Sequence, residues 1–316
     1  MSKYLVTGGA GFIGSHLSRY LVSEGHEVVI LDNLSTGRLE NIADLTDKVR
    51  FVEGSITDID TVRGCCQGVD CVFHQAALPS VPRSVADPLT SDEHNIGGTL
   101  RVFWGAHQEG VRRVVYAASS SIYGDTEELP KHEGMQPKPM SPYAVNKRVS
   151  ELYGSVFNNL YGLSTIGLRY FNVFGPRQDP NSQYAAVVPK FITAFLNGEA
   201  PVIHGDGGQS RDFTFIDNVV EANMAACNAD NNAGGRSYNV ALGGRISVSD
   251  LCQRIGELLG TDIVPVHELT RAGDVRHSQA SVDLAREYLG YKGSVSLEEG
   301  LRQTVTWYQN NHVVPE

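Results

Sequence analysis

The first half of the chain alternates between short apolar runs and segments with helical spacing. Tyr4 to Thr7 is a run of β-forming residues, and apolar side chains in 12–24 then recur on one helical face. The alternation continues with strands predicted at 28–31, 49–52, 71–73, 114–117 and 164–169, and helices at 59–66, 95–109 and 142–161. Val28 to Leu31 is continuously apolar, as in a strand covered on both faces. Such alternation predicts right-handed crossovers and a parallel sheet.

The pattern changes after Tyr170. Residues 172–184 are rich in Gly, Pro, Asn and Asp, which is typical of a loop. Shorter elements follow, with helices predicted near 186–197 and 216–228 and strands at 202–203 and 238–240. We therefore expect an α/β fold in which a doubly wound parallel sheet spans 1–171, with parts of 213–240 returning to it, and a smaller α/β C-terminal domain consists of 172–212 and 241–316.

Composition and charge narrow the classes of protein that fit this pattern. The 316 residues carry a formal net charge of -10, which provides no basic surface for nucleic acid and requires a local basic site for any anionic ligand. No apolar run approaches the length of a membrane span, and the first strand begins without a cleavable hydrophobic segment. The five cysteines show no CxxC spacing, which favours reduced thiols over a metal site. We expect a cytoplasmic protein that binds no nucleic acid, membrane or metal.

Three glycines, Gly8, Gly11 and Gly14, lie between the first strand and the first helix. At this place they allow a tight turn and let the backbone approach a pyrophosphate at the helix N-terminus. Asp32 ends the second strand, where a carboxylate accepts hydrogen bonds from both ribose hydroxyls of NAD and repels the 2′-phosphate of NADP. Arg38 follows and leaves some NADP binding open. Together these residues predict a Rossmann site for NAD.

Asp58 follows the third strand, and two interpretations of it stay open. At this point of a dinucleotide-binding fold, a side chain usually holds the adenine. Thr57-Asp58 equally suits the N-cap of the next helix.

Tyr143 and Lys147 lie on a predicted helix. Because positions i and i+4 share a helix face, the phenol and the ammonium are adjacent. The charge of Lys147, and that of an oxidised nicotinamide, favours the phenolate and lowers the pKa of Tyr143, which predicts a general base for an alcohol proton. Ser119, Ser120 and Ser121 close the fifth strand, where their hydroxyls face the ligand crevice and can relay that proton. A serine run also suits a plain polar strand end.

Longer stretches of sequence carry a family resemblance. The segments TGGAGFIGSH at 7–16, SSSIYGD at 119–125, SPYAVNK at 141–147 and LRYFNVFGPRQDP at 168–180 resemble the extended short-chain dehydrogenase/reductase family, and within it the sugar-nucleotide 4-epimerases. The segments ALPSVPRSVADP at 77–88, RQDPNSQYAAVVPK at 177–190, GDGGQSRDF at 205–213 and GDVRHSQA at 273–280 are similar to the UDP-N-acetylglucosamine 4-epimerase subgroup. This resemblance covers essentially the whole chain. It implies a small C-terminal domain that closes over a UDP-sugar and NAD that stays bound through the cycle.

The same resemblance implies which residues bind the two ligands. The implied NAD contacts are Phe12, Ile13, Asp32, Asn33, Ser35, Gly37, Asp58, Ile59, Gln75, Ala76, Asn95, Tyr143, Lys147 and Tyr170. The implied UDP-sugar contacts are Asn172, Arg211 and Arg271 at the diphosphate, Asp274 at a ribose hydroxyl, Val202 and His204 beside uracil, and Ser121, Ala186 and Ser278 at the sugar. Arg211 and Arg271 also suit surface ion pairs, and His204 also suits a structural loop.

Three positions bear on the choice of sugar. The glucose/galactose epimerases commonly carry a bulky Tyr where Ser278 stands, so the smaller residue opens a wall for an N-acetyl group, and Ala186 keeps a second wall small. Pro79 differs both from the Lys of those enzymes and from the Gly of the N-acetyl subgroup. We expect NAD-dependent C4 epimerisation of UDP-N-acetylglucosamine and UDP-N-acetylgalactosamine, and also of UDP-glucose and UDP-galactose. The alternative is an enzyme that prefers the non-acetylated pair.

Other activities of the same fold fit less well. A sugar-nucleotide 4,6-dehydratase needs an acid pair directly after the strand-end Ser or Thr, and Ser120 and Ser121 occupy those positions. A UDP-glucuronate decarboxylase tends to carry a Glu in this run, which contains none. A non-catalytic NAD-binding regulator loses the Tyr or the Lys, and this chain has both.

The resemblance also implies a homodimer. In it, the helices at 95–109 and 142–161 pair with their two-fold mates as a four-helix bundle. Apolar side chains on these helices include Val102, Phe103, Val149 and Leu152. Each of them either joins that interface or packs on the sheet.

Overall fold

A parallel sheet of seven strands forms the centre of the computed structural model, which describes residues 1–180, 186–269 and 275–311. The strand order is β11-β6-β5-β4-β1-β2-β3. The strands are β1 (Lys3–Thr7), β2 (Glu27–Asp32), β3 (Arg50–Glu53), β4 (Cys71–His74), β5 (Arg113–Ser119), β6 (Ser164–Tyr170) and β11 (Arg236–Val240). Because β1 lies between β2 and β4, the chain builds the sheet outward first on one side of β1 and then on the other. Ligands of doubly wound folds bind at this switch point, beyond the carboxyl ends of the strands.

The strand register brings residues that are distant in sequence to one edge of the sheet. β1 pairs with β2 so that Thr7 lies opposite Leu31, and β5 pairs with β6 so that Ser119 lies opposite Tyr170. The end of β4 lies beside Thr7 in the same way. The predicted cofactor and catalytic segments therefore begin at a common edge.

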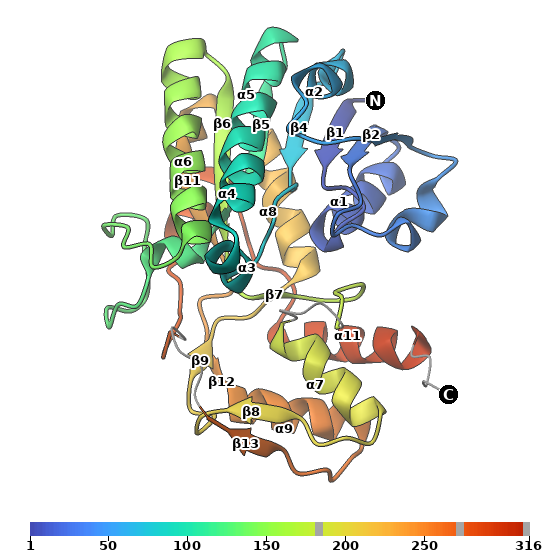
Figure 1. Ribbon diagram of the computed structural model, residues 1–316, viewed down its shortest axis with the longest axis vertical. Helices are drawn as coiled ribbons and strands as arrows, with labels where there is room; N and C mark the ends of the chain where they lie inside the picture. Colours follow the sequence, from blue (N-terminus) through green and yellow to red (C-terminus); the bar gives the residue numbers. More distant parts are fainter. Residues whose placement is uncertain (181–185, 270–274, 312–316) are drawn as a thin grey trace.

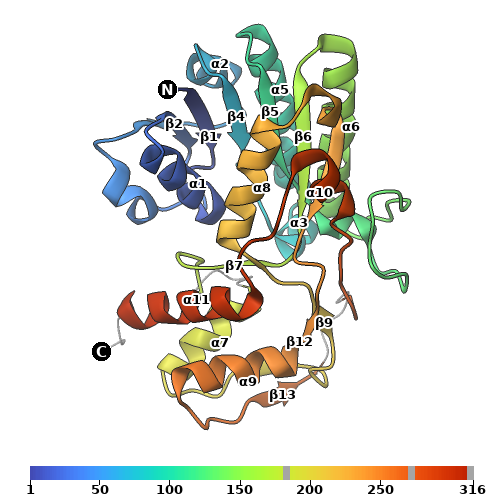
Figure 2. The same cartoon turned by 180° about the vertical axis from the view of Figure 1, so that it is seen from behind.

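Helices cover both faces of the sheet, as Figures 1 and 2 show from opposite sides. One face carries α1 (Phe12–Ser23) and α8 (Ile216–Asn228), and the other carries α2 (Ile59–Cys66), α5 (Thr99–Gln108) and α6 (Pro142–Tyr161). Val102 and Phe103 of α5 are fully buried in the core beneath this second layer. These two side chains therefore pack on the sheet, which is one of the two interpretations given for them, and the homodimer stays a prediction.

The helix predicted at 95–109 begins earlier than expected. Asp87 caps α4 (Pro88–Asp92) by accepting a 3.0 Å hydrogen bond from the Thr90 amide, and Pro88 suits the first turn. A π-helical turn at Glu93–Gly98 then joins α4 to α5. The remaining short helices are α3 (Val81–Ala86) and the 3-10 turns Leu39–Leu45, Ser120–Tyr123 and Asn231–Ala233.

A smaller layer of helices and short strands lies beyond the carboxyl edge of the sheet, in the lower half of Figure 1. Its helices are α7 (Val187–Leu196), α9 (Val248–Leu259) and α11 (Leu297–Asn311). Its strand pairs are β7 (Val173–Phe174) with β10 (Thr214–Phe215), β9 (Ser210–Arg211) with β12 (Ile246–Ser247), and β8 (Val202–His204) with β13 (Val266–Glu268). Most of these strands have two residues, so hydrophobic periodicity could not show them.

One segment of the C-terminal region packs on the sheet. α10 (Asp283–Leu289) contacts β11 and α8, where Ala285 and Leu289 are buried (Figure 2). Arg236 of β11 stacks on the Tyr288 ring at 4.8 Å. The apolar face of this segment therefore lies against the sheet, while its assignment to the smaller domain, like the other predicted domain boundaries, stays a prediction.

Three further properties concern the described residues alone. Within them, no helix is long and apolar enough to cross a membrane. No cluster of three or more His, Cys, Asp or Glu residues in these ranges could hold a metal ion. All five cysteines are free and buried.

Candidate cofactor and active site

A cavity of about 640 Å³ lies at the switch point of the sheet. Its lining joins the ends of the central strands to the start of α6 and to the loop after β7. Of the predicted site residues, it includes Gly8, Gly11, Phe12, Ile13, Gly14, Asp32, Asn33, Ser35, Gln75, Ala76, Ser119, Tyr143, Lys147, Tyr170, Asn172 and Ala186. The structure thus brings together residues that the sequence could only name separately, while their contacts with ligands stay predictions.

Two glycines, one in the turn after β1 and one in the first turn of α1, leave no room for a side chain. Gly8 has φ +69°, and a Cβ added there would lie 2.7 Å from the Ala76 amide nitrogen. A Cβ added at Gly14 would lie 2.1 Å from the Gly8 carbonyl oxygen. The turn therefore exposes bare backbone at the N-terminus of α1, a cradle that suits a dinucleotide pyrophosphate.

Asp32 lies at the end of β2 and is held by backbone donors. Its carboxylate accepts hydrogen bonds from the Ala10 amide at 3.0 Å and from the Leu34 amide at 2.8 Å. Burial raises the pKa of this carboxyl, and the two amide bonds oppose that rise. Gly37 packs on it so closely that an added Cβ would lie 2.8 Å from both carboxylate oxygens. The carboxylate is fixed at the cavity wall, where the chemistry of its oxygens fits ribose hydroxyls.

Gln75 and Tyr170 are positioned by a residue that the sequence did not reveal. The Tyr170 hydroxyl donates to Gln75 Oε1 at 3.2 Å, and Gln75 Nε2 donates to Asn223 Oδ1 at 3.0 Å. Asn223 Nδ2 closes the ring of contacts by donating to the Tyr170 hydroxyl at 2.9 Å. Asn223 lies on α8, far along the chain, so only the fold shows its role.

Four of the predicted cofactor residues lie outside the cavity lining, namely Gly37, Asp58, Ile59 and Asn95. Asn95 is buried and exchanges hydrogen bonds with the backbone of Leu78, so it supports the lining segment. Asp58 is exposed and caps α2, accepting from the Asp60 amide at 3.1 Å and from the Thr61 hydroxyl at 2.6 Å. The structure therefore supports the helix-cap interpretation of Asp58. A contact of Asp58 or its neighbour Ile59 with adenine stays a prediction.

Tyr143 and Lys147 share the first turns of α6, as their spacing predicts. Ser141 caps this helix by accepting from the Ala144 amide at 3.2 Å, and the Tyr143 amide donates to Ser84 Oγ at 3.1 Å. Lys147 Nζ lies 5.8 Å from the centre of the Tyr143 ring and donates to the Ala117 carbonyl at 2.7 Å. The helix start and the end of β5 thus hold the phenol and the ammonium together at the cavity.

The pKa of Tyr143 differs from the sequence expectation. In the protein alone, burial raises it to about 12, and a hydrogen bond with Ser119 lowers it only in part. Burial also lowers the pKa of Lys147 to about 8, because the desolvated ammonium is disfavoured. The expected depression of the Tyr143 pKa by Lys147 is therefore absent, since desolvation of the phenolate is the larger effect.

The three serines after β5 have different surroundings. Ser119 lines the cavity, shares a hydrogen bond with Tyr143 and lies 2.9 Å from the Ser121 hydroxyl, measured between the Oγ atoms. Ser120 and Ser121 lie outside the lining. A chain of hydroxyl groups therefore runs from Tyr143 through Ser119 to Ser121, whereas Ser120 begins the 3-10 turn.

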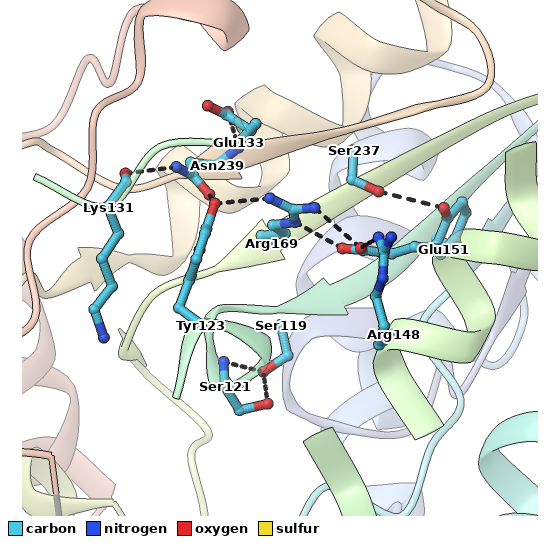
Figure 3. A network of polar contacts seen from close by, with 11 residues as sticks. Ser119, Ser121, Tyr123, Lys131, Glu133, Arg148, Glu151, Arg169, Ser237 and Asn239 are labelled. Atoms are coloured by element: carbon cyan, nitrogen blue, oxygen red, sulfur yellow. Dashed lines mark hydrogen bonds and ion pairs between the residues drawn. The ribbon is translucent and has the colours of Figure 1, made fainter. Parts of the chain in front are cut away.

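A buried polar network connects Tyr123, in the 3-10 turn after β5, to α6, β6 and β11 (Figure 3). Arg169 donates to Glu151 at 2.7 and 3.0 Å and to the Tyr123 hydroxyl at 2.7 Å. That hydroxyl donates to Asn239 Oδ1, and Asn239 Nδ2 donates to the Lys131 carbonyl. Because Glu151 lies one helical turn after Lys147, the network ties the catalytic face of α6 to β6.

The residues predicted to bind the sugar and uridine lie less close together than the predicted cofactor residues. Asn172 and Ala186 line the cavity, whereas Val202, His204, Arg211 and Ser278 do not. Arg211 donates to the Ser210 carbonyl at 2.9 Å, and Ser278 is buried, with its amide donating to the same carbonyl at 3.0 Å. Val202 and His204 lie on β8, where they face Val266 and Glu268 of β13. Arg271 and Asp274 lie outside the described residues.

Several lining residues were not predicted to bind a ligand. They come from β7, from the loop after it and from α11, and they include Val173, Arg177, Gln178, Asp179 and Trp307. The loop follows a strand end, a signal that could have placed it at the ligand edge. Nothing in the sequence around Trp307 points to the cavity.

Comparisons with known proteins agree with this geometry. The chain is 41% identical over 312 residues to a UDP-glucose 4-epimerase of Mycolicibacterium smegmatis, covering 98% of this chain and 99% of that one. Among solved structures, it is similar to a UDP-N-acetylglucosamine 4-epimerase of Methanobrevibacter ruminantium in complex with UDP-N-acetylmuramic acid, with a TM-score of 0.94, 40% identity and coverage of 98% and 99%. A UDP-glucose 4-epimerase of Thermotoga maritima with UDP-glucose follows, with a TM-score of 0.93, 38% identity and the same coverage. Residues 4–241 match the family described as NAD dependent epimerase/dehydratase, and the chain belongs to this family.

Proposed function

We propose that this protein is a UDP-hexose 4-epimerase that acts on UDP-N-acetylglucosamine and UDP-N-acetylgalactosamine, and also on UDP-glucose and UDP-galactose. The observation that carries this proposal is the joint placement of Tyr143, Lys147 and Ser119 at a glycine-lined dinucleotide cavity. The epimerases of similar sequence and structure support the same reaction.

The residues of the chain account for binding and for movement of the proton. When bound, NAD supplies the hydride acceptor for C4 of the sugar and, in its oxidised form, a positive charge in the cavity. The turn at Gly8 to Gly14 binds the pyrophosphate, and Asp32 orients a ribose. Tyr143 takes the proton of the C4 hydroxyl, Ser119 hydrogen-bonds to the same group, and the Lys147 ammonium stabilises the phenolate.

The preference for N-acetylated sugars rests on the size of two side chains. Both faces of C4 must reach the same nicotinamide, so the pocket must hold the sugar in two orientations and the 2-substituent meets two walls. Ala186 at the cavity and Ser278 keep these walls small, whereas a close-packed pocket strains against added atoms. The alternative, an enzyme that prefers UDP-glucose and UDP-galactose, makes Ser278 an ordinary loop residue.

The uridine diphosphate is assigned to residues of the smaller layer. In this proposal, Asn172, Arg211 and Arg271 bind the diphosphate, Asp274 binds a ribose hydroxyl, and Val202 and His204 flank uracil. Arginines suit this role because a guanidinium presents paired donors to phosphate oxygens. They also provide local positive charge in a chain whose net charge is -10.

A homodimer and a cytoplasmic location are part of the same proposal. One face of α6 leaves Val145, Leu152, Val156 and Leu160 exposed, and Trp104 of α5 is also partly exposed. Contiguous apolar side chains of this kind suit a two-fold helix bundle, and light scattering at micromolar concentration tests it: a monomer would contradict it. The five free cysteines are compatible with a reducing compartment.

The decisive experiment compares the four UDP-sugars in one coupled assay, with the unmodified protein and with Ser278→Tyr. We expect turnover of the N-acetylated pair to match or exceed that of the other pair. Ser278→Tyr should remove the N-acetyl activity and spare UDP-galactose, and Ser278→Ala, which keeps the wall small, should change neither. An unchanged ratio in Ser278→Tyr would overturn the size argument, and inactivity of the unmodified protein on all four sugars would overturn the proposed reaction.

A further inference from the structure

One charged side chain at the cofactor cavity has no role in the proposed reaction. Arg38 lines the cavity and directly follows Gly37, the residue that packs on the Asp32 carboxylate. Its amide donates to the Ala10 carbonyl at 3.0 Å, which fixes its backbone against the glycine turn. In dinucleotide-binding folds, an arginine near this position accommodates the 2′-phosphate of NADP. Arg38 therefore stands where it could counteract the preference for NAD that Asp32 provides.

The Arg38 guanidinium is turned toward another carboxylate. Its Nη2 lies 2.6 Å from Oδ2 of Asp179, which lines the same cavity from the loop after β7. The two side chains are 55% and 31% exposed, so the ion pair lies at the rim. A guanidinium that donates to this carboxylate has fewer donors left for a phosphate in the cavity.

The loop that carries Asp179 is anchored at the residues directly before it. His16 Nε2 contacts the Pro176 carbonyl at 2.9 Å, and Gln178 Nε2 donates to the Val173 carbonyl at 3.0 Å. The Tyr308 hydroxyl of α11 donates to the Gln178 carbonyl. These contacts come from elements far apart in the chain, so the carboxylate is presented to Arg38 by a held segment.

We propose that Asp179 is a specificity-determining residue that favours NAD over NADP by holding Arg38 away from a 2′-phosphate. It acts as a positioning residue through Arg38, in addition to the direct repulsion of that phosphate by Asp32. The inference rests on the dinucleotide-binding part of the proposed function and is independent of the sugar.

The test measures which nucleotide the purified protein carries. Unmodified protein and Asp179→Asn are produced in the same cells and denatured, and the released NAD and NADP are quantified by chromatography and mass spectrometry. We expect the ratio of NADP to NAD to rise roughly 1.5-fold to fivefold in Asp179→Asn, as for one charged contact at an exposed site. In the double variant Arg38→Gln/Asp179→Asn, the ratio should return to that of the unmodified protein.

Glu40→Gln is the matched control. Glu40 is an exposed carboxylate in the lining of the same cavity, whereas the ion pair of Arg38 is made with Asp179. Three results would each overturn the proposal: an unchanged ratio in Asp179→Asn, an equal rise of the ratio in Glu40→Gln, or a rise that persists in the double variant. Total nucleotide per protein shows whether a variant still binds, and Asp179→Ser replaces Asp179→Asn if that variant carries none. Because no sugar is present, lack of epimerase activity would refute the proposed reaction and leave this inference standing.

Discussion

The cofactor side and the sugar side of the cleft are built from different kinds of structure. The cofactor side consists of the carboxyl ends of long, buried, parallel strands, with the turn after β1 and the start of α6 packed on them. The sugar side, as proposed, takes Arg211 from a two-residue strand and Ser278 from a segment that meets the rest of the chain in isolated bridges. A regular sheet determines the geometry of the cofactor side, whereas contacts between separate loops determine that of the sugar side.

This difference separates the parts that bind the cofactor from the parts that select the sugar. On the cofactor side, bare backbone suits the pyrophosphate that all dinucleotides share, and one fixed carboxylate at Asp32 favours NAD over NADP. On the sugar side, single side chains such as Ser278 set the size of the pocket and can change without disturbing the sheet. We therefore expect substitutions on the sheet side to have large effects on turnover or stability, and substitutions on the sugar side to change the ratio between substrates.

The largest effect is expected for Tyr143→Phe. It removes the hydroxyl that takes the substrate proton, so turnover should fall roughly 100- to 10,000-fold, the range for loss of a general base. Bound NAD should remain, because the glycine turn and Asp32 are untouched. Tyr161→Phe, on the same helix and partly exposed, is the control and should keep full turnover. Steady-state assays and nucleotide release measure both, and near-normal turnover of Tyr143→Phe would show that the chemistry lies elsewhere.

Glu151→Ala should have the next largest effect, on stability. It leaves the buried Arg169 guanidinium without its carboxylate partner, which costs about 3–5 kcal/mol in the free energy of unfolding. Arg148→Ala removes a partly exposed partner of the same carboxylate and should cost less than about 1 kcal/mol. Urea unfolding of the three proteins provides the comparison. Equal losses of unfolding free energy in the two variants would mean that the network in Figure 3 contributes little to the stability of the sheet side.

The pH dependence of turnover tests the role of the Lys147 charge. With its pKa lowered to about 8, Lys147 loses its ammonium as the pH rises above that value, and turnover should then fall about tenfold per pH unit. Loss of folded protein at high pH does not explain this fall in turnover. Between about 8 and the ordinary value of 10.5, the unfolded chain binds more protons than the folded one, so the contribution of Lys147 to stability rises with pH.

The pH profile of Lys147→Arg is the control for this prediction. A guanidinium stays charged throughout this pH range, so the fall near pH 8 should disappear while some turnover remains. If the fall persists in Lys147→Arg, it belongs to another group.

The contrast between the two sides also explains how much of the structure could be predicted from the sequence. The strand ends, the glycine turn and the pair Tyr143–Lys147 were predictable, because a parallel sheet brings the carboxyl ends of its strands to one edge whatever the connections are. Asn223 and Asp179 were not predicted, because their roles depend on α8 and on the loop after β7 returning to the cavity. The raised pKa of Tyr143 was missed for a related reason: spacing shows the neighbouring charge, but burial appears only in the fold.

The smallest expected effect concerns Asp58, and it tests where the cofactor side ends. Its carboxylate caps α2 by accepting from the Asp60 amide and the Thr61 hydroxyl, and it lies outside the cavity lining. If this cap is its only role, Asp58→Ala should lower the Tm by about 2 °C and leave the bound NAD unchanged. Asp58→Asn separates the two interpretations, because an amide still caps a helix but carries no charge. Loss of NAD from Asp58→Asn at an unchanged Tm would place this carboxylate among the cofactor contacts, and the sheet side would then extend beyond β3.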